Sequence, residues 1–163
     1  MDVTATLAAP YPADAVFAVV GDLASYPKWL DIVPRADVAS REPDDERPVW
    51  SVDLRGRLGP FARSKRLRMM RTTFEEPRLV VFERAELDGR DHSPWILTAD
   101  VAPTASGSSL TMRLHYGGGL FGPVLERLLR DEIERSKPPS SFIAASRAAT
   151  FWSAVMPAIE GST

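Results

Sequence analysis

Apolar and polar residues alternate along most of the first 116 positions, which is the pattern of strands with one buried face. The first such segment, residues 3–8, ends at Ala9-Pro10-Tyr11-Pro12, because proline cannot donate a backbone N–H to a sheet. The spacing then changes to that of a helix. Apolar residues recur at i, i+3, i+4 and i+7, as Val16, Val19, Val20 and Leu23. The sequence therefore predicts a strand, a short helix from Ala13, and a second short helical turn over Tyr26–Ile32.

Six further extended segments follow, separated by turn residues and not by helical patterns. They are Ala36–Arg41, Val49–Arg57, Arg63–Phe74, Arg78–Leu87, Trp95–Val101 and Ser109–Tyr116. Gly56–Pro60 and Gly107-Ser108 predict two of the turns. Strands linked by short turns pair antiparallel, and such a sheet commonly has one dry face and one solvated face. The alternation indicates a dry face with Trp50, Val52, Leu54, Leu67, Met69, Trp95, Leu97, Ala99, Val101, Leu110, Met112, Leu114 and Tyr116.

A long helix is predicted after the last strand. Gly117-Gly118-Gly119 breaks that strand, and Pro138-Pro139 ends the helix. One side of the helix is apolar, with Val124, Leu125, Leu128, Leu129 and Ile133. The inner face of the sheet is the one large dry surface available to it. The expected fold class is therefore α+β: a curved antiparallel sheet of about seven strands wrapped around a long C-terminal helix, with two short helices after the first strand.

Residues 1–137 form one predicted domain, and residues 138–163 form an apolar extension beyond it. The extension carries six large apolar side chains: Phe142, Ile143, Phe151, Trp152, Val155 and Met156. Two interpretations stay open, a second helix that docks on this chain or on a partner, and an extension without fixed structure. Docking is favoured because exposed aromatic side chains promote association in water. A homodimer through the extension is one form of such docking.

Composition and charge narrow the function classes. The formal charge is −2, from 20 basic and 22 acidic side chains, whereas a nucleic-acid binder of this size usually has a clear basic excess. No nucleic-acid partner is therefore expected. No membrane span is expected either, because no run of about 18 apolar residues is present. The chain has no cysteine and begins without a basic segment followed by an apolar run, which together predict a cytoplasmic location.

Basic side chains concentrate in Arg55–Arg71. Runs of charge are usually solvated, so this segment predicts the wet face of two adjacent strands. Contact with an anionic ligand head group or an anionic surface is the alternative.

The segment Asp22-Leu23-Ala24-Ser25-Tyr26-Pro27-Lys28-Trp29-Leu30 resembles the signature of the START-like superfamily. This superfamily, also called SRPBCC or Bet v 1-like, includes the polyketide cyclase/dehydrase and lipid transport group. The likeness covers roughly residues 2–137, and Gly117–Pro123 is similar to an actinobacterial subgroup. The resemblance implies a helix-grip fold with a hydrophobic tunnel between sheet and helix. It also implies that the chain binds a sterol, lipid, quinone or polyketide; a minority of members catalyse cyclisation or dehydration, and some are toxins of toxin–antitoxin pairs.

No residue pattern predicts a catalytic or metal centre. His92 falls in a polar turn and His115 on the outer sheet surface, both expected in solvent, and metal-ligand spacings such as HExxH are absent. Asp22 beside Tyr26 and Trp29 has the chemistry of a general acid or base, but an aspartate between two short helices more often caps free backbone N–H groups. No cofactor is expected, since the glycine run at 117–119 lacks the lysine and threonine of a phosphate loop.

The candidate ligand-binding residues are aromatic and apolar side chains of the dry face and the helix, with Arg71 and Tyr116 as orienting polar contacts. Cavities for small molecules are mostly apolar and aromatic. The alternative is a solid core, but a sheet that grips one helix is hard to fill completely. The set is Trp29, Trp50, Val52, Leu67, Met69, Arg71, Trp95, Leu97, Met112, Leu114, Tyr116, Leu125 and Leu129.

Three functions fit this sequence. A non-enzymatic carrier or sensor, which binds a hydrophobic small molecule (lipid, polyketide or quinone-like) in an internal cavity, is favoured because no catalytic constellation is present. A polyketide cyclase or dehydratase is the second, and it requires at least two inward ionisable or hydroxyl groups. The third is a protein-interaction role, such as a toxin–antitoxin component, through the apolar extension or the Arg55–Arg71 face.

Overall fold

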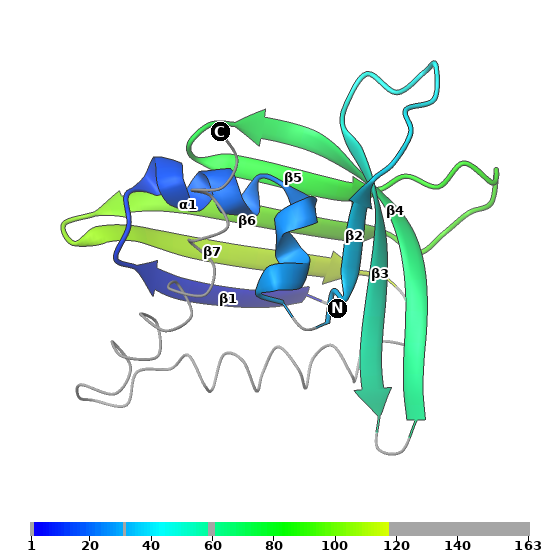
Figure 1. The fold of residues 1–163 in the computed structure, drawn as a ribbon, viewed down its shortest axis with the longest axis horizontal. Helices are drawn as coiled ribbons and strands as arrows, with labels where there is room; N and C mark the ends of the chain where they lie inside the picture. The colour runs from blue at the N-terminus through cyan, green and yellow to red at the C-terminus, as the bar shows by residue number, and fades with distance from the viewer. Residues whose placement is uncertain (1, 31, 59–60, 118–163) are drawn as a thin grey trace.

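The computed structural model describes residues 2–30, 32–58 and 61–117 of the chain (Figure 1). These residues form strands of one sheet, one α-helix and one 3-10 helix. In chain order the elements are β1 (Asp2–Ala9), α1 (Ala13–Val20), η1 (Leu23–Lys28), β2 (Arg35–Val38), β3 (Val49–Leu58), β4 (Phe61–Glu75), β5 (Leu79–Arg84), β6 (Trp95–Thr104) and β7 (Gly107–Tyr116).

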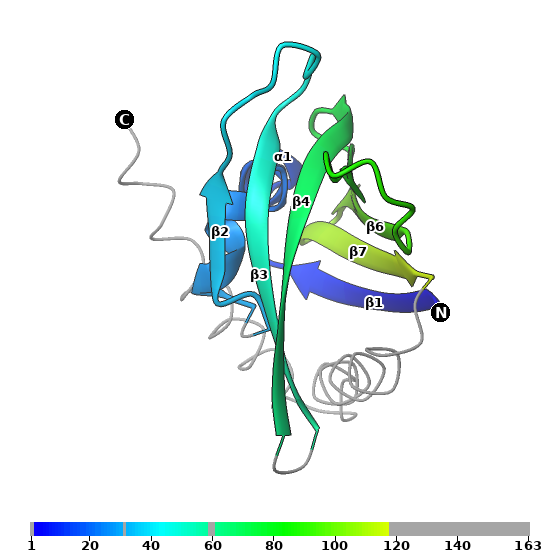
Figure 2. The same cartoon turned by 90° about the vertical axis from the view of Figure 1, so that its right-hand side faces the viewer.

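The seven strands form one antiparallel sheet in the order β1-β7-β6-β5-β4-β3-β2. The sheet is strongly curved, since β3 and β4 stand steeply across the direction of β1 and β7 (Figure 2). α1 and η1 connect the edge strands β1 and β2 and pack against one face of the sheet. We call this the inner face. The predicted antiparallel, curved sheet is thereby confirmed.

The inner face is mainly apolar. Because residues that pair directly across two strands share a face, the register identifies its members. Inner-facing pairs are Val52 with Leu67, Trp50 with Met69, Arg71 with Phe82, Phe82 with Leu97, Leu97 with Leu114, Ala99 with Met112, Val101 with Leu110, and Trp95 with Tyr116. The dry face predicted from the alternation is the face observed.

α1 covers part of the inner face. It buries four apolar side chains, Val16, Phe17, Val19 and Val20. Beneath it, Ala99, Val101 and Leu110 are fully buried. The helix begins after Pro12, whose backbone is extended, and ends at Gly21. A Cβ at Gly21 would lie 2.9 Å from the Phe17 carbonyl oxygen, so a larger residue would force the end of the helix away from its neighbours.

Several predicted boundaries change; among them, β2 ends at Val38 and β5 at Arg84, before the predicted ends at Arg41 and Leu87. The second helical turn covers Leu23–Lys28 and not Tyr26–Ile32, because it starts directly at its capping residue, Asp22. The β3–β4 hairpin is longer than predicted: pairing continues to Leu58 and Phe61, so most of the expected Gly56–Pro60 turn is strand. Gly107 and Ser108 also belong to a strand, β7. The long helix predicted over residues 124–133 and the extension 138–163 lie outside the described residues.

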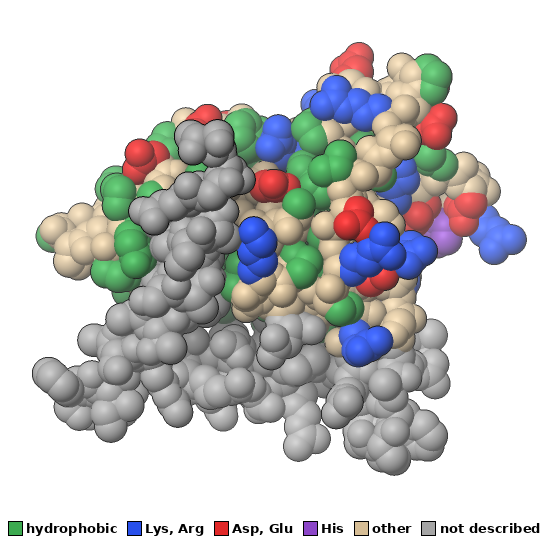
Figure 3. All heavy atoms as spheres, in the orientation of Figure 1, with side chains coloured by type: hydrophobic (Ala, Val, Ile, Leu, Met, Phe, Trp, Pro, Cys, Tyr) green, Lys and Arg blue, Asp and Glu red, His purple; other side chains and the backbone are tan. Residues whose placement is uncertain are grey.

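Part of the basic segment faces solvent, as predicted: Arg55 and Arg66 are exposed, whereas the Arg68 side chain is only 13% exposed. Arg66 makes a bidentate ion pair with Asp53 on the adjacent strand, with N–O distances of 2.6 and 3.0 Å, and this bond and charge lower the pKa of Asp53. Arg68 pairs with Asp45 and donates to the Ala85 carbonyl. Acidic and basic side chains also lie side by side near β2, where Arg35 pairs with Asp37 (Figure 3). Two residues of the segment, Lys65 and Arg71, instead share the inner face with Leu67 and Met69.

Candidate functional site

One region of the inner face is organised by Asp22, the residue predicted to cap a helix. Its carboxylate accepts the Ala24 backbone N–H at 2.9 Å, and it is the N-cap of η1, which confirms that prediction. The same Oδ1 also accepts the indole N–H of Trp50 at 3.1 Å. Trp50 is 4% exposed, yet its one polar atom is satisfied. Asp22 therefore ties η1 to β3.

Aromatic side chains fill the space beside this bond. Tyr26 is fully buried, and its hydroxyl donates to the Val20 carbonyl at 2.9 Å. Burial, reinforced by the negative charge of Asp22, raises the pKa of Tyr26 far above its ordinary value. The Tyr26 ring lies 4.5 Å from that of Trp29 and 6.3 Å from that of Phe82, which in turn lies edge-on to Trp50. This part of the inner face is a packed core.

Arg71 lies in the same region. Its guanidinium donates to the Gly21 carbonyl at 3.2 Å and lies 3.8 Å from the ring centroid of Phe74. Desolvation lowers the pKa of Arg71, opposed by the nearby charge of Asp22. These contacts hold the α1–η1 corner against β4. We name the set Asp22, Tyr26, Trp50, Arg71 and Phe82 the Asp22 region.

A second region, which we name the Trp95 region, contains Trp95, Tyr116, Lys65, Leu97 and Leu114. The rings of Trp95 and Tyr116 pair directly across β6 and β7, with centroids 4.5 Å apart. Trp95 is 3% exposed, but its indole N–H has no hydrogen-bond partner among the residues that the structure describes. A buried donor without an acceptor costs stability, so this atom calls for an explanation.

Lys65 brings an ammonium group to the same place. Its Nζ lies 5.9 Å from the centroid of the Trp95 ring. Desolvation lowers the pKa of Lys65, and the charge of Arg84 adds to this effect while that of Glu86 opposes it. The prediction of a wet basic segment missed this residue. Its parity with Leu67 and Met69 was the available signal, since alternate residues of a strand share a face.

Arg84 also faces inward, opposite Met69 in the register, and its side chain is 8% exposed. Its guanidinium donates to Glu86 at 2.9 Å, to the Ser93 carbonyl at 3.2 Å and to Nδ1 of His92 at 3.2 Å. Because arginine has only donors, Nδ1 of His92 must accept, and Nε2–H then donates to Asp88 at 2.8 Å. The guanidinium of Arg84 therefore places a positive charge next to the Trp95 region.

His92 differs from its prediction as a solvent-exposed turn residue. Its side chain is only 27% exposed, because the loop that carries it folds back on Arg84. His115 is on the outer surface, as predicted, and bonds to Asp2 at 2.7 Å. Within residues 2–117, apart from the undescribed positions, no group of three His, Asp or Glu side chains is placed to hold a metal ion.

Leu97 and Leu114 of the Trp95 region form, together with Met112, an apolar patch that is only half-buried. Leu97, Met112 and Leu114 face inward, yet each keeps some exposed surface, whereas their neighbours under α1 are fully buried. The patch continues onto β1, where Val3 pairs with Leu114 and Ala5 with Met112. Apolar surface on the concave side of the sheet is therefore accessible.

Of the predicted ligand-binding residues, eleven are described and all belong to or pack against this inner face. Six are buried apolar or aromatic residues, namely Trp50, Val52, Leu67, Met69, Trp95 and Tyr116; three form the half-buried patch, namely Leu97, Met112 and Leu114; the other two are Trp29 and Arg71. Leu125 and Leu129 lie outside the described residues. That these residues bind a ligand stays a prediction.

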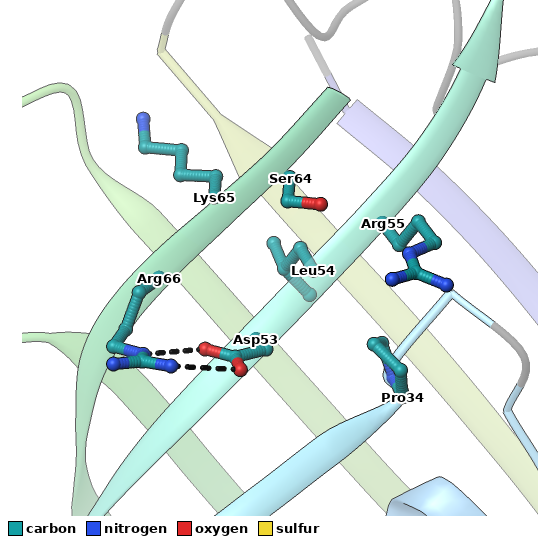
Figure 4. A pocket seen from close by; sticks show the side chains of 7 residues that line it. All are labelled: Pro34, Asp53, Leu54, Arg55, Ser64, Lys65 and Arg66. Atoms are coloured by element: carbon teal, nitrogen blue, oxygen red, sulfur yellow. Dashed lines mark hydrogen bonds and ion pairs between the residues drawn. The ribbon is translucent and has the colours of Figure 1, made fainter. Parts of the chain in front are cut away.

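A separate cleft of about 200 Å³ lies beside the β3–β4 hairpin (Figure 4). Its lining includes Pro34, Arg55 and the Asp53–Arg66 ion pair. The Lys65 side chain leaves β4 on the side away from Arg55 and Pro34 (Figure 4). Common ligand pockets measure about 300–1,000 Å³. The cleft is smaller, and two of its charged groups, Asp53 and Arg66, already pair with each other, so it is a poor candidate for the site.

A family model described as polyketide cyclase / dehydrase and lipid transport matches residues 1–136. The chain belongs to this family. The resemblance to the START-like superfamily, found in the sequence, is thereby confirmed. None of the helices that the structure describes is long and apolar enough to cross a membrane.

Solved structures share the fold of this family member. A protein from Thermus thermophilus has a TM-score of 0.61 at 18% identity, with 98% of this chain and 99% of that chain covered. A START superfamily protein from Mycobacterium smegmatis has a TM-score of 0.61 at 15% identity, with 99% of both chains covered. The di-domain ARO/CYC StfQ from the steffimycin biosynthetic pathway has a TM-score of 0.58 at 14% identity, with 98% of this chain and 51% of that chain covered. No curated protein sequence matches the chain.

Proposed function

We propose that this protein binds a hydrophobic small molecule against the inner face of its sheet, as a carrier or sensor. The observation that carries the proposal is the half-buried patch of Leu97, Met112 and Leu114 on the concave side of the sheet. Accessible apolar surface at a concave place costs free energy in water, and an apolar guest removes that cost. Membership of a family described by polyketide cyclases, dehydrases and lipid transport supports the same function.

The test uses the neutral fluorescent probe N-phenyl-1-naphthylamine with two matched substitutions. Leu97→Asp places a charge in the patch and is expected to weaken probe binding by about tenfold or more, because burying an unpaired carboxylate is costly. Leu87→Asp makes the same change at a residue that is 59% exposed, outside the site, and is expected to leave binding unchanged. Saturable binding that survives Leu97→Asp, or the absence of saturable binding to the wild type, contradicts the proposal.

A cyclase or dehydratase is the second candidate. The observation in its favour is that Lys65, whose ammonium can donate a proton, and Tyr116, which carries a hydroxyl, both come from the inner face beside Trp95. Enolisation of a 3-oxo thioester would exchange the protons of its α-carbon with deuterated water. NMR of such a thioester, incubated with the protein, distinguishes the two candidates: exchange that depends on Lys65 favours an enzyme, and binding without exchange favours a carrier.

Several finer statements are also proposals. The lipid-, polyketide- or quinone-like nature of the guest, the cytoplasmic location, the absence of a nucleic-acid partner and the actinobacterial subgroup stay predictions. So does the homodimer, which depends on residues 138–163, and so does the protein-interaction role, which depends on those residues or on the Arg55–Arg71 face. Mass spectrometry of the protein purified from its host under native conditions tests the nature of the guest directly, since a retained guest adds its mass to the chain.

A further inference from the structure

The Trp95 region offers hydrogen-bond donors to whatever occupies the inner face. The indole N–H of Trp95 can only donate, and so can the ammonium of Lys65. Trp95 is only 3% exposed, and its N–H has no acceptor among the described residues. An atom of this kind costs free energy in a folded protein unless a guest or a water supplies the acceptor.

The charges nearby indicate which acceptor fits. Lys65 Nζ lies 5.9 Å from the Trp95 ring centroid, and Arg84 is close enough for its charge to act on Lys65. Arg84 already donates to Glu86, to the Ser93 carbonyl and to His92. Hydrogen bonds from a cation to an oxyanion are about twice as strong as neutral ones, and they strengthen further in a partly desolvated site. An anionic oxygen therefore gains more here than a neutral one.

We infer that the guest is an apolar molecule with a carboxylate group, whose oxygens accept the Trp95 indole N–H and the Lys65 ammonium while its apolar body covers Leu97 and Leu114. This inference rests on the proposed function, because it names the chemical class of the guest of the same face. The structure favours no particular body, so an acyl chain and an aromatic ring are both compatible with the carboxylate anchor.

The experiment compares matched probes by titration calorimetry near neutral pH. Dodecanoate with dodecan-1-ol represents an acyl chain, and 2-naphthoate with 2-naphthol represents an aromatic body. We expect the wild type to bind the better acid about tenfold more tightly than its alcohol, the ratio that one charge-assisted hydrogen bond typically supplies. The acid–alcohol pair that shows this tenfold preference identifies whether the apolar part of the guest is an acyl chain or an aromatic ring.

Two substitutions locate the anchor. Lys65→Met keeps an unbranched apolar stem but removes the charge, and Trp95→Phe keeps an aromatic ring but removes the N–H. Each is expected to weaken acid binding by about fivefold to tenfold while alcohol binding changes by less than about twofold. Lys28→Met is the control, because Lys28 is exposed at the end of η1, and it is expected to change neither affinity.

The outcomes separate this inference from the proposed function. If both acid and alcohol bind equally well to the wild type, the proposed function holds and the carboxylate anchor is wrong. The anchor is also wrong if the preference for the acid persists in both Lys65→Met and Trp95→Phe. If neither these probes nor N-phenyl-1-naphthylamine binds, the proposed function itself fails and the anchor falls with it.

Discussion

Trp50 and Trp95 lie on the same face of one sheet, and each is almost completely buried, at 4% and 3% exposure. Their surroundings differ. The Trp50 indole donates to Asp22, a residue 28 positions away that also caps η1. The Trp95 indole has no acceptor among the described residues, although a lysine ammonium lies over its ring. One tryptophan completes a structural network, and the other presents an unused donor.

The two regions of this face therefore differ in how their buried polar groups are satisfied. In the Asp22 region, the end of α1 and the cap of η1 supply the acceptors, so the buried donors of Trp50, Tyr26 and Arg71 each have a partner. In the Trp95 region, the Trp95 indole N–H has no acceptor among the described residues, and Leu97, Met112 and Leu114 keep exposed apolar surface. The first region holds the fold together, and the second is where we propose that a guest binds.

The largest expected effect contrasts the cores of the two regions. Phe82→Ala removes a fully buried ring that contacts Tyr26 and Trp50, so it should lower the free energy of unfolding by about 4 kcal/mol. Leu97→Ala, in the half-buried patch, should cost only about 1 kcal/mol, because folding removes only part of the Leu97 side chain from water. Urea unfolding followed by far-UV circular dichroism measures both. Equal losses would mean that the patch is packed as tightly as the core.

The next effect concerns Asp22. Asp22→Ala removes the cap of η1 and the acceptor of the Trp50 indole, and each loss should cost about 1 kcal/mol, for about 2 kcal/mol in total. The same urea titration applies. Asp14→Ala, at an exposed position in the first turn of α1, is the control and should lose much less. A negligible loss for Asp22→Ala would contradict the structural role of the carboxylate.

The direct comparison of the tryptophans comes third. Trp50→Phe and Trp95→Phe delete the same atoms from equally buried positions, so their difference isolates the hydrogen bond. Trp50→Phe should be more destabilising by about 1 kcal/mol, because only Trp50 loses a bonded partner. Thermal unfolding by calorimetry, with both variants scanned in one buffer, gives the difference. A larger loss for Trp95→Phe would reverse the assignment of the two regions.

The smallest effect is a pH dependence that originates from Lys65. Its pKa in the folded protein is lowered from the ordinary value of 10.5, mainly by desolvation, so the unfolded chain binds more protons between the two values. Stability must therefore rise as the pH increases from the lowered pKa towards 10.5. Urea midpoints of the wild type should rise relative to those of Lys65→Met across this window. A constant difference would show that Lys65 is solvated like an ordinary surface lysine.

The sequence by itself determined the strands, the buried face of most of them, and the capping role of Asp22; for β5 the alternation left open which of its two apolar faces is buried, and the structure buries Val80 and Phe82. These features are local: side chains alternate with period two along any strand, and an aspartate before a helical turn caps it through neighbouring atoms. Even the inward direction of Lys65 was present in its parity with Leu67 and Met69, although its charge suggested a solvated position.

Only the tertiary structure decided which polar groups find partners. Trp50 and Asp22 are brought together by the return of η1 onto β3, and Arg71 donates to the carbonyl of Gly21, 50 positions away. His92 is likewise drawn back to Arg84 by its loop. The first two pairings depend on where α1 and η1 cross the curved sheet. They arise from the packing of distant segments, since the partners lie 28 and 50 positions apart in the sequence.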